Sequence, residues 1–307
     1  MTDTLKKVFV IAVSMLIPIF FLVISSNGAA VKFRYLTSIY TGEQDTPLEQ
    51  PEGVACNDQS LLVVADTGNG RFLRYTVQDE LLKPGPVEIK LNQISYPTKI
   101  KLNSKNEIYA FDRKERRIIR LSPAGEFMGY LNLSGLPPPA SYTLRSFDID
   151  LSDNIYVLDI LSGRVLVLNP EGEYQKHIDL PKEYGFFSDL TVDFQGNVLL
   201  IDSVDAIVFS AAHNSSSFSS LTKSLKEYMR FPSNIITDSR GRIYLIDRNG
   251  GRIIILGQDG SFLERQLEMG WREGWLNYPG QMCINQKGEI FVADTKNNRV
   301  QIFKAVE

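Results

Sequence analysis

The residues of this chain that most readily suggest chemistry are an aspartate and an arginine five positions apart, Asp294 and Arg299, around a polar turn. A carboxylate can accept amide hydrogens from such a turn and can pair with the two-pronged guanidinium group. Six segments align on this pattern, and five of them keep both residues. The aspartates are Asp66, Asp112, Asp159, Asp202, Asp247 and Asp294, and the arginines are Arg71, Arg117, Arg164, Arg252 and Arg299. A catalytic pair is needed once, so a pair that recurs in five segments indicates a structural role.

The same alignment defines a unit that repeats every 43–47 residues. A proline lies fifteen residues before the aspartate in four copies, and Asn or Asp lies nine residues before it in all six. Each copy predicts a short strand opened by the proline, a turn, a β-branched strand that ends at the aspartate, a tight turn and a third strand. A less regular segment, such as residues 172–180, supplies a fourth strand. Four strands at this period are typical of a β-propeller, so the sequence predicts an all-β, six-bladed propeller.

The last copy ends after its third strand, at the C-terminus. A strand-like run over residues 30–42 precedes the first complete copy. We expect residues 32–40 of this run to be the outer strand of the blade that residues 279–307 build. The two ends of the chain would then be joined without a covalent bond, and no open gap would separate the first and last blades.

The last copy, GEIFVADTKNNRVQIF over residues 288–303, resembles the NHL repeat, whose pattern is a strand, then A-D-x-x-N-x-R, then a strand. The resemblance extends over residues 31–307 and implies a propeller of the NHL type. The fourth copy departs furthest, because it lacks both the Asn and the Arg of the pattern, with Ile207 in place of the Arg. The resemblance says little about function, because similar propellers include protein- and RNA-binding modules, extracellular sensors, amidating lyases and lactonases.

The inner strands of a propeller line its channel, so the residues just after each proline position should surround the channel entrance. Candidate ligand-binding residues at this entrance are Glu52, Lys99, Lys101, Arg113, Lys114, Arg116, Arg145, Asp148, Asp189, Asn234 and Gln281. Lys101 and Asp148 occupy equivalent positions on neighbouring blades, and buried ions must be paired, so we expect an ion pair between them. A polar pocket for a small ligand is the alternative interpretation.

The densest basic cluster of the chain is RKERR, at residues 113–117, on the turn that should open beside this entrance. A solvated turn accounts for such a cluster. An anionic partner, such as a polysaccharide, a lipid headgroup or an acidic protein, is the functional alternative.

No recognisable catalytic cluster is present, and the sequence predicts no catalytic residue and no cofactor. The resemblance leaves a metal-dependent propeller enzyme of the lactonase or lyase type as an alternative. Glu52, Asp189 and Asn234 are oxygen ligands of the kind that a lactonase-type propeller uses around a divalent metal. Lys99 and Lys101 would repel such a cation, so no metal site is predicted.

Histidines and cysteines narrow the chemistry further. The chain has two histidines, His177 and His213, neither at an inner-strand position, which disfavours the histidine-held metal of the lyase type. Cys56 and Cys283 lie on the inner strands of the first and last blades, which closure makes neighbours. A disulfide that closes the ring and two free thiols both remain open at this point.

The N-terminal residues 1–30 form a separate region. Val8 and Ile24 bound an uncharged, hydrophobic stretch that follows Lys6 and Lys7. As a helix it would span about 26 Å at ~1.5 Å per residue, close to a hydrocarbon core of ~30 Å. The small residues that follow resemble a signal cleavage region. We expect a signal anchor or a cleaved signal peptide that exports the propeller, with a buried N-terminal helix as the remaining alternative.

Charge supports the same outline of function. The net charge of −3 and the pI of about 5.6 provide no global field toward nucleic acid, which export also disfavours. The sequence therefore predicts a non-enzymatic, membrane-associated, extracytoplasmic propeller. We expect it to bind a protein or an anionic ligand through its channel-entrance face.

Overall fold

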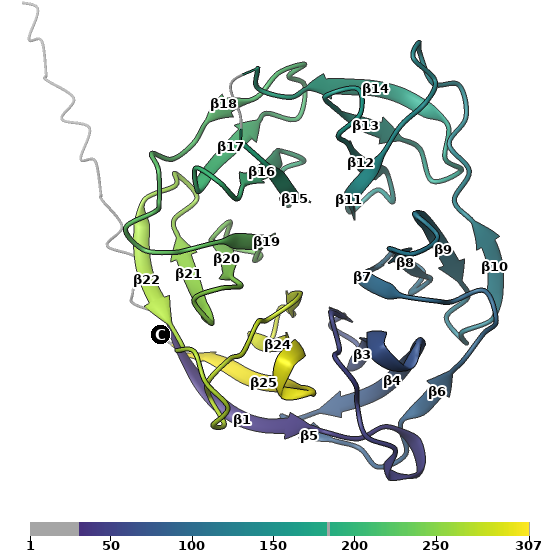
Figure 1. The fold of residues 1–307 in the computed structure, drawn as a ribbon, viewed down its shortest axis with the longest axis vertical. Coiled ribbons are helices and arrows are strands. Elements are labelled where there is room, and N and C mark those ends of the chain that lie inside the picture. Colours follow the sequence, from purple (N-terminus) through teal and green to yellow (C-terminus); the bar gives the residue numbers. More distant parts are fainter. Residues whose placement is uncertain (1–30, 183–184, 307) are drawn as a thin grey trace, which may run out of the picture.

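Six antiparallel sheets stand around a central channel in the computed structural model, which describes residues 31–182 and 185–306 (Figure 1). Blade 1 contains β2 (Gly53–Cys56), β3 (Leu61–Asp66), β4 (Arg71–Gln78), β5 (Leu81–Leu82) and β6 (Val87–Ile89). Blade 2 contains β7 (Pro97–Leu102), β8 (Ile108–Asp112), β9 (Arg117–Leu121) and β10 (Phe127–Tyr130). Blade 3 contains β11 (Leu144–Ile149), β12 (Ile155–Asp159), β13 (Arg164–Leu168) and β14 (Tyr174–Asp179).

The remaining blades follow the same order from the channel outward. Blade 4 contains β15 (Phe187–Val192), β16 (Val198–Asp202), β17 (Ile207–Ala211) and β18 (Ser219–Ser220). Blade 5 contains β19 (Pro232–Thr237), β20 (Ile243–Asp247), β21 (Arg252–Leu256) and β22 (Phe262–Gln266). Blade 6 contains β23 (Met282–Ile284), β24 (Glu289–Asp294), β25 (Arg299–Val306) and β1 (Lys32–Ile39). Single 3-10 turns lie at η1 (Glu43–Asp45), η2 (Thr67–Asn69) and η3 (Thr295–Asn297).

The middle strands hold the propeller together because they bury both of their faces. Successive residues of a strand point to opposite sides, so each sheet can pack against two neighbours. In β3, Leu62 and Val64 pack with blade 6, whereas Val63 and Ala65 pack with blade 2. Each of the six hydrophobic clusters lies between two adjacent blades. The core is therefore a ring of six interfaces around the channel.

The predicted closure of the ring is confirmed. Strand β1 pairs antiparallel with β25, from Lys32 opposite Val306 to Ile39 opposite Val300, and ends one residue short of the predicted range (Figure 1). A disulfide between Cys56 and Cys283, whose Cα atoms lie 6.0 Å apart, joins the inner strands of the same two blades. Of the two states that the sequence left open for these cysteines, the structure has the bridged one.

The repeated aspartates fasten each blade at the turn between its second and third strands. All six accept backbone N–H groups; Asp202, for example, accepts four, from Gly185, Phe186, Val204 and Asp205. Burial alone would raise the pKa of Asp202, but these donors hold it below its usual value. The structural role predicted for the aspartates is thus confirmed.

The repeated arginine does not pair with its aspartate in every blade that has one, which corrects the expected Asp–Arg pairing. The expected ion pair forms in three blades, at 2.7 Å for Asp66–Arg71, 3.2 Å for Asp159–Arg164 and 2.7 Å for Asp294–Arg299. In blade 2, Arg117 instead lies over the ring of Tyr130, 5.1 Å from its centroid. In blade 5, no ion pair between Asp247 and Arg252 is found, although both residues are described. The amides already satisfy the aspartate, so the arginine is free to pack elsewhere.

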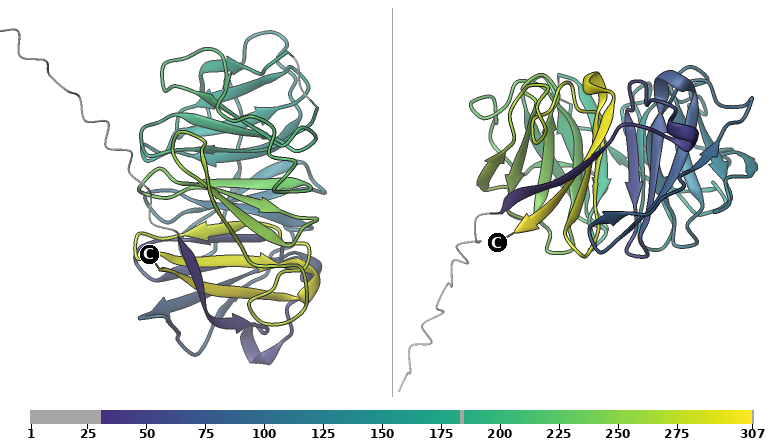
Figure 2. Two further views of the ribbon diagram at one scale, coloured as in Figure 1. Left: turned by 90° about the vertical axis from the view of Figure 1, so that its left-hand side faces the viewer. Right: turned by 90° about the horizontal axis from the view of Figure 1, so that it is seen from below.

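The predicted hydrophobic segment between Val8 and Ile24 lies outside the described residues. Within residues 31–182 and 185–306, no helix is long and apolar enough to cross a membrane. Strand β1 starts at the end of blade 6 that is remote from the Asp294 turn, because Lys32 pairs with Val306 and Ile39 pairs with Val300. Figure 2 shows β1 running along the outer wall between the two faces of the propeller.

Candidate functional site

Two consecutive residues of the inner strands face the channel at its entrance, which a regular strand would not allow. The pairing of the first two strands slips at this point in four blades, between Pro97 and Ile100 and at the three equivalent positions. Such a bulge re-aims side chains, so two successive layers of residues line one cavity. The upper layer is Glu52, Thr98, Arg145, Ser188, Ser233 and Gly280, and the lower layer is Gly53, Lys99, Ser146, Asp189, Asn234 and Gln281.

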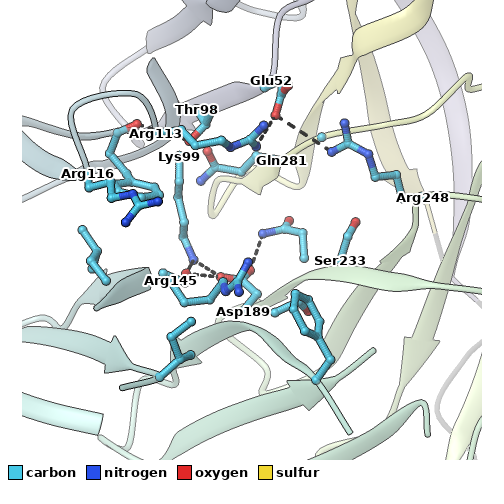
Figure 3. Close-up of a pocket in the computed structure, with 18 of the residues that line it drawn as sticks. Glu52, Thr98, Lys99, Arg113, Arg116, Arg145, Asp189, Ser233, Arg248 and Gln281 are labelled. Carbon is cyan, nitrogen blue, oxygen red and sulfur yellow. Dashed lines mark hydrogen bonds and ion pairs between the residues drawn. The ribbon is translucent and has the colours of Figure 1, made fainter. Parts of the chain in front are cut away.

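The cavity has a volume of about 650 Å³ and opens on the face of the Asp turns (Figure 3). Its walls combine both layers with residues from those turns. Five cationic side chains line it, namely Lys99, Arg113, Arg116, Arg145 and Arg248, against the two carboxylates of Glu52 and Asp189. Apolar walls come from Phe111, Leu144, Ile160, Phe186 and Phe231. We call this region the entrance mouth.

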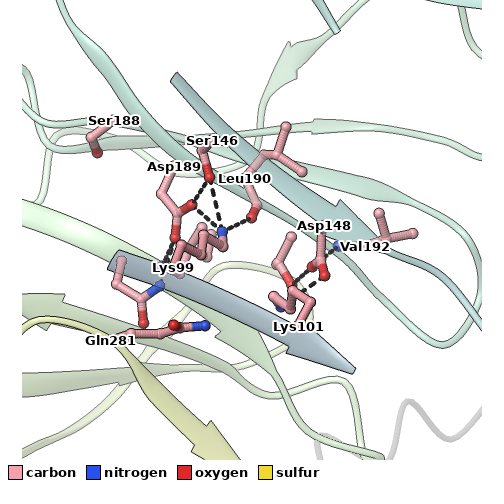
Figure 4. Close-up of polar contacts among 12 residues, drawn as sticks. Lys99, Lys101, Ser146, Asp148, Ser188, Asp189, Leu190, Val192 and Gln281 are labelled. Atoms are coloured by element: carbon pink, nitrogen blue, oxygen red, sulfur yellow. Dashed lines mark hydrogen bonds and ion pairs between the residues drawn. The ribbon is translucent and has the colours of Figure 1, made fainter. Parts of the chain in front are cut away.

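The lower layer forms a hydrogen-bonded floor, which we call the ring. The Lys99 ammonium contacts the Asp189 carboxylate, the Ser146 hydroxyl at 2.9 Å and the Leu190 carbonyl at 3.2 Å (Figure 4). On the other side, Asp189 accepts the Asn234 amide at 2.6 Å. Blades 2, 3, 4 and 5 are thus linked through one carboxylate.

Blade 6 completes the ring through Gln281. Its side-chain oxygen accepts the backbone N–H of Val54 at 3.2 Å and of Ile100 at 2.9 Å, and its amide donates to the Ile100 carbonyl at 2.8 Å. The Asn234 oxygen in turn accepts the N–H of Met282 at 3.1 Å. All six inner strands therefore share one polar network, and its charged members are paired.

One step deeper, Lys101 and Asp148 form the predicted ion pair, at 2.7 Å. Asp148 also accepts the Thr191 hydroxyl at 2.8 Å. Burial would raise the pKa of Asp148, but the Lys101 and Lys99 ammonium groups hold it below its usual value. These two residues lie beneath the cavity and do not line it.

The upper layer is different, because its charges are not balanced. Glu52 is the one carboxylate of this layer, and it accepts Arg113 at 2.7 Å and the Tyr96 hydroxyl at 3.3 Å. The Arg248 guanidinium approaches the same carboxylate at 4.0 Å. Two arginines from turns of blades 2 and 5 therefore share one negative charge.

Arg145 has no anionic partner among the described residues. Its guanidinium lies over the ring of Phe186, 4.5 Å from the centroid, and its Nε is buried without a hydrogen-bond partner. Burial, followed by repulsion from Arg113, lowers the pKa of Arg145. The hydroxyl of Ser233, which lines the same cavity, is also buried and without a partner. Arg116 is exposed at the rim and forms no ion pair with the described residues.

Most of the sequence-predicted site residues come together. The residues that line the entrance mouth are Glu52, Lys99, Arg113, Arg116, Arg145, Asp189, Asn234 and Gln281. Lys101 and Asp148 lie below it, and Lys114 lies on the same turn as Arg113 but outside the cavity lining. The three missed residues Arg248, Ile160 and Phe186 matter most. A signal existed for two of them, because Ile160 and Arg248 directly follow the repeat aspartates, as Arg113 does.

The residues suggested for a lactonase-type metal do not form a cation site. Asp189 and Asn234 belong to the ring. There the Asp189 carboxylate already binds a cation, the Lys99 ammonium, and also accepts the Asn234 amide. Glu52 lies in the upper layer against Arg113 and Arg248. Five cations around this cavity would oppose a divalent metal, so the residues present do not fit one.

A second cavity, of about 500 Å³, opens at the opposite end of the channel, and we call it the far mouth. Its lining contains five aspartates and neither lysine nor arginine: Asp58, Asp150, Asp153, Asp193 and Asp238. Their carboxylates accept nearby donors. Asp150 accepts the N–H groups of Ser152 at 2.8 Å and Asn154 at 2.9 Å, and Asp193 holds the equivalent turn of blade 4.

The six antiparallel sheets around one channel define a six-bladed β-propeller, and comparisons with known proteins add the repeat type. The NHL repeat model matches residues 276–303. The chain is 33% identical over 75 residues to human NHL repeat-containing protein 3 and 32% identical over 75 residues to the mouse protein. Each match covers 24% of this chain and 22% of the relative, so the chain spans under a quarter of those relatives' length. The chain therefore contains a match to the NHL repeat within a six-bladed β-propeller.

Solved structures support the fold alone, because their sequence identity is low. A gluconolactonase from Xanthomonas campestris superposes with a TM-score of 0.63 at 13% identity, over 90% of this chain and 95% of that one. Virginiamycin B lyase from Staphylococcus aureus superposes with a TM-score of 0.59 at 11% identity, over 90% and 99% of the two chains. Similarity at this level carries no activity over to the present chain.

Proposed function

We propose that this protein is a non-enzymatic binding module that holds an anionic ligand or partner at its entrance mouth. The observation that carries the proposal is the unbalanced positive charge of the upper layer and the adjoining turns. Among the described residues, Arg116 and Arg145 have no anionic partner, and Arg113 and Arg248 share Glu52. Arg145 is half-buried and its Nε has no hydrogen-bond partner among the described residues, and a buried polar atom without a partner costs stability unless a ligand satisfies it. The floor beneath it is satisfied by its own residues, so the ligand's partners are the upper layer and the turns.

We further propose that the propeller works outside the cytoplasm, next to a membrane. The Cys56–Cys283 disulfide favours an oxidising compartment, and the stretch between Val8 and Ile24 is apolar enough to serve as an anchor or a signal. Strand β1 begins at the far-mouth end of blade 6. A membrane anchor that precedes β1 would therefore leave the entrance mouth facing away from the bilayer. No nucleic-acid partner is expected, for the reasons of charge and export given above.

The metal-dependent enzyme is the weaker alternative. Its candidate ligands Glu52, Asp189 and Asn234 are divided between two layers, and the oxygens of each already accept protein donors. No observation at this site favours hydrolysis or elimination over binding.

Partner capture by the full chain tests the proposal. We compare a variant with Arg116→Gln and Arg145→Gln with a control that carries Lys114→Gln and Arg117→Gln. Both lose two positive charges, but the control changes side chains outside the cavity lining. We expect the first variant to lose capture of the anionic partner by about tenfold, which corresponds to about 1.4 kcal/mol, while the control keeps it. Equal capture by all three chains would contradict the proposal.

The location is tested separately in sealed membrane vesicles of known sidedness. We expect added protease to digest the propeller from the non-cytoplasmic side alone. Digestion from the cytoplasmic side would overturn the proposed location and would leave the binding site unaffected.

A further inference from the structure

The entrance mouth is a cup-shaped cavity that the ring closes at its floor, and we call this cavity the cup. Its shape limits the size of the ligand that it can hold. The ring spans the channel with contacts from all six inner strands, so a ligand enters and leaves through the upper face. The cup of about 650 Å³ lies within the range of ~300–1,000 Å³ that is usual for small-molecule sites. A macromolecule would touch the rim and insert no more than a side chain.

The polar groups that lack partners identify one end of the ligand. Five buried side-chain N or O atoms in the described part of the chain have no hydrogen-bond partner, and two of them, Arg145 Nε and Ser233 Oγ, belong to residues of the cup. They occupy equivalent upper-layer positions on blades 3 and 5. A guanidinium with an unpartnered donor and an unpartnered hydroxyl, both lining one cavity, are suited to an oxyanion such as a carboxylate. Buried polar groups without partners cost stability, so a ligand that satisfies them gains affinity.

The apolar walls identify the other end. Phe186 lies beneath the Arg145 guanidinium, and Phe111, Ile160 and Phe231 line the same space from blades 2, 3 and the start of blade 5. Ile160 is 38% exposed, so it presents carbon to whatever fills the cup. A small inorganic anion would satisfy the guanidinium and leave these walls against water. A flat apolar group attached to the anion would cover them.

We infer that the entrance mouth binds a small organic anion with an oxyanion head and a flat apolar body. This inference rests on the proposed function and names the class of ligand for the same site. Arg145 and Ser233 hold the head, Arg116 attracts it from the rim, and the phenyl rings enclose the body. Glu52 limits the negative charge that the ligand can carry, because its one carboxylate pairs with Arg113 and offsets part of the charge of Arg248.

The test uses 2-naphthoate, its neutral analogue 2-naphthamide, and inorganic phosphate. Each is titrated calorimetrically into the full-length chain in lipid nanodiscs, with empty nanodiscs as the blank. We expect one saturable site for 2-naphthoate and an affinity at least about tenfold higher than for 2-naphthamide or phosphate. Equal affinity for 2-naphthamide would overturn the oxyanion head, and equal affinity for phosphate would overturn the apolar body.

Two matched arginine variants locate the site. Arg145→Met keeps carbon over Phe186 but removes the guanidinium, and we expect it to weaken 2-naphthoate binding about tenfold. Arg120→Met is the control, because Arg120 also lies over an aromatic ring, 5.4 Å from the Tyr109 centroid, and also has a buried Nε without a partner. Arg120 does not line the cup, so its variant should bind as the wild type does. If both variants bind equally well, the assignment to this mouth is wrong.

A third variant guards against a folding defect in Arg145→Met. Arg116 is exposed, so Arg116→Gln should fold normally and still weaken 2-naphthoate binding severalfold. If 2-naphthoate does not bind while the variant with Arg116→Gln and Arg145→Gln loses partner capture, the small organic anion is excluded and the binding module stands. If capture also persists in that variant, both proposals fail.

Discussion

The two ends of the channel are both charged, but they use their charges differently. At the far mouth, five aspartates meet turn amides and hydroxyls of their own and neighbouring blades; Asp153, for example, accepts the Ser104 hydroxyl at 2.6 Å. At the entrance mouth, five cations meet two carboxylates, one of which is engaged in the ring. The far mouth is acidic because its turns need acceptors. The entrance mouth carries more cationic side chains than its carboxylates can pair, so the needs of the fold do not account for its positive charge.

This difference teaches that charge alone does not identify a site. The repeat places an Asn or Asp at each far-mouth turn, and three of the five far-mouth aspartates, Asp150, Asp193 and Asp238, occupy this position. The other two, Asp58 and Asp153, accept N–H groups from neighbouring blades. Arg145 and Arg116 follow no repeat rule, and no other blade has a cation at the position of Arg145. Unmet hydrogen-bonding groups at a position that the repeat does not dictate are the stronger indication of function.

The largest effect is expected from breaking the ring that separates the two mouths. Lys99→Met leaves Asp189 buried without its cation, which typically costs about 3–5 kcal/mol. Urea denaturation should show this loss in the free energy of unfolding. Adding Asp189→Asn removes the stranded charge, so the double variant should lose less than the sum of the two single variants. Simple additivity would mean that the two residues do not act together.

Removing the disulfide should have the next largest effect on stability. Cys56→Ser with Cys283→Ser releases a link between residues 227 apart in sequence and should cost about 2–4 kcal/mol. Cys56 lines the far mouth, so 2-naphthoate binding at the entrance should be unchanged at temperatures where the variant is folded. Reductant should lower the stability of the wild type and leave that of the double variant unchanged. Lost 2-naphthoate binding in the folded variant would mean that the two mouths are coupled.

Substituting a far-mouth aspartate should lower the stability of the fold and leave 2-naphthoate binding unchanged. Asp150→Ala removes the acceptor for the N–H groups of Ser152 and Asn154 and should cost about 1–3 kcal/mol in the free energy of unfolding. The dissociation constant of 2-naphthoate should stay within about twofold of the wild-type value. A larger change would place part of the ligand site at the wrong end of the channel.

The smallest expected effect is a gain in the affinity for 2-naphthoate. Glu52→Gln frees Arg113 and Arg248, so the affinity for 2-naphthoate should rise by about threefold to tenfold, or roughly 1 kcal/mol. Glu80→Gln is the matched control, because it removes a carboxylate that pairs with Arg34 at 2.9 Å and does not line the cup. The gain should shrink in high salt. A loss of affinity in Glu52→Gln would show that Glu52 itself contacts the ligand.

Sequence periodicity could predict the fold because each blade carries the same markers. The proline position located the entrance layers, and equivalent register positions paired Lys101 with Asp148. Periodicity also placed both residues after each proline position at the entrance, but it could not predict the strand bulge that turns them into one cavity. It also missed that Lys99 reaches past blade 3 to Asp189 on blade 4. Side chains that pack on aromatic rings, as Arg145 does on Phe186, follow from tertiary contacts that no repeat encodes.

The central claim is that the entrance mouth, and not the far mouth, binds an organic anion. A crystal of the protein soaked with 6-bromo-2-naphthoate tests it directly, because bromine gives an anomalous signal that locates the ligand without reference to its shape. We predict one strong bromine peak in the entrance mouth beside Phe186, with the carboxylate at Arg145. A peak at the far mouth, or no ordered bromine in a crystal whose entrance mouth is open to solvent, would contradict the account.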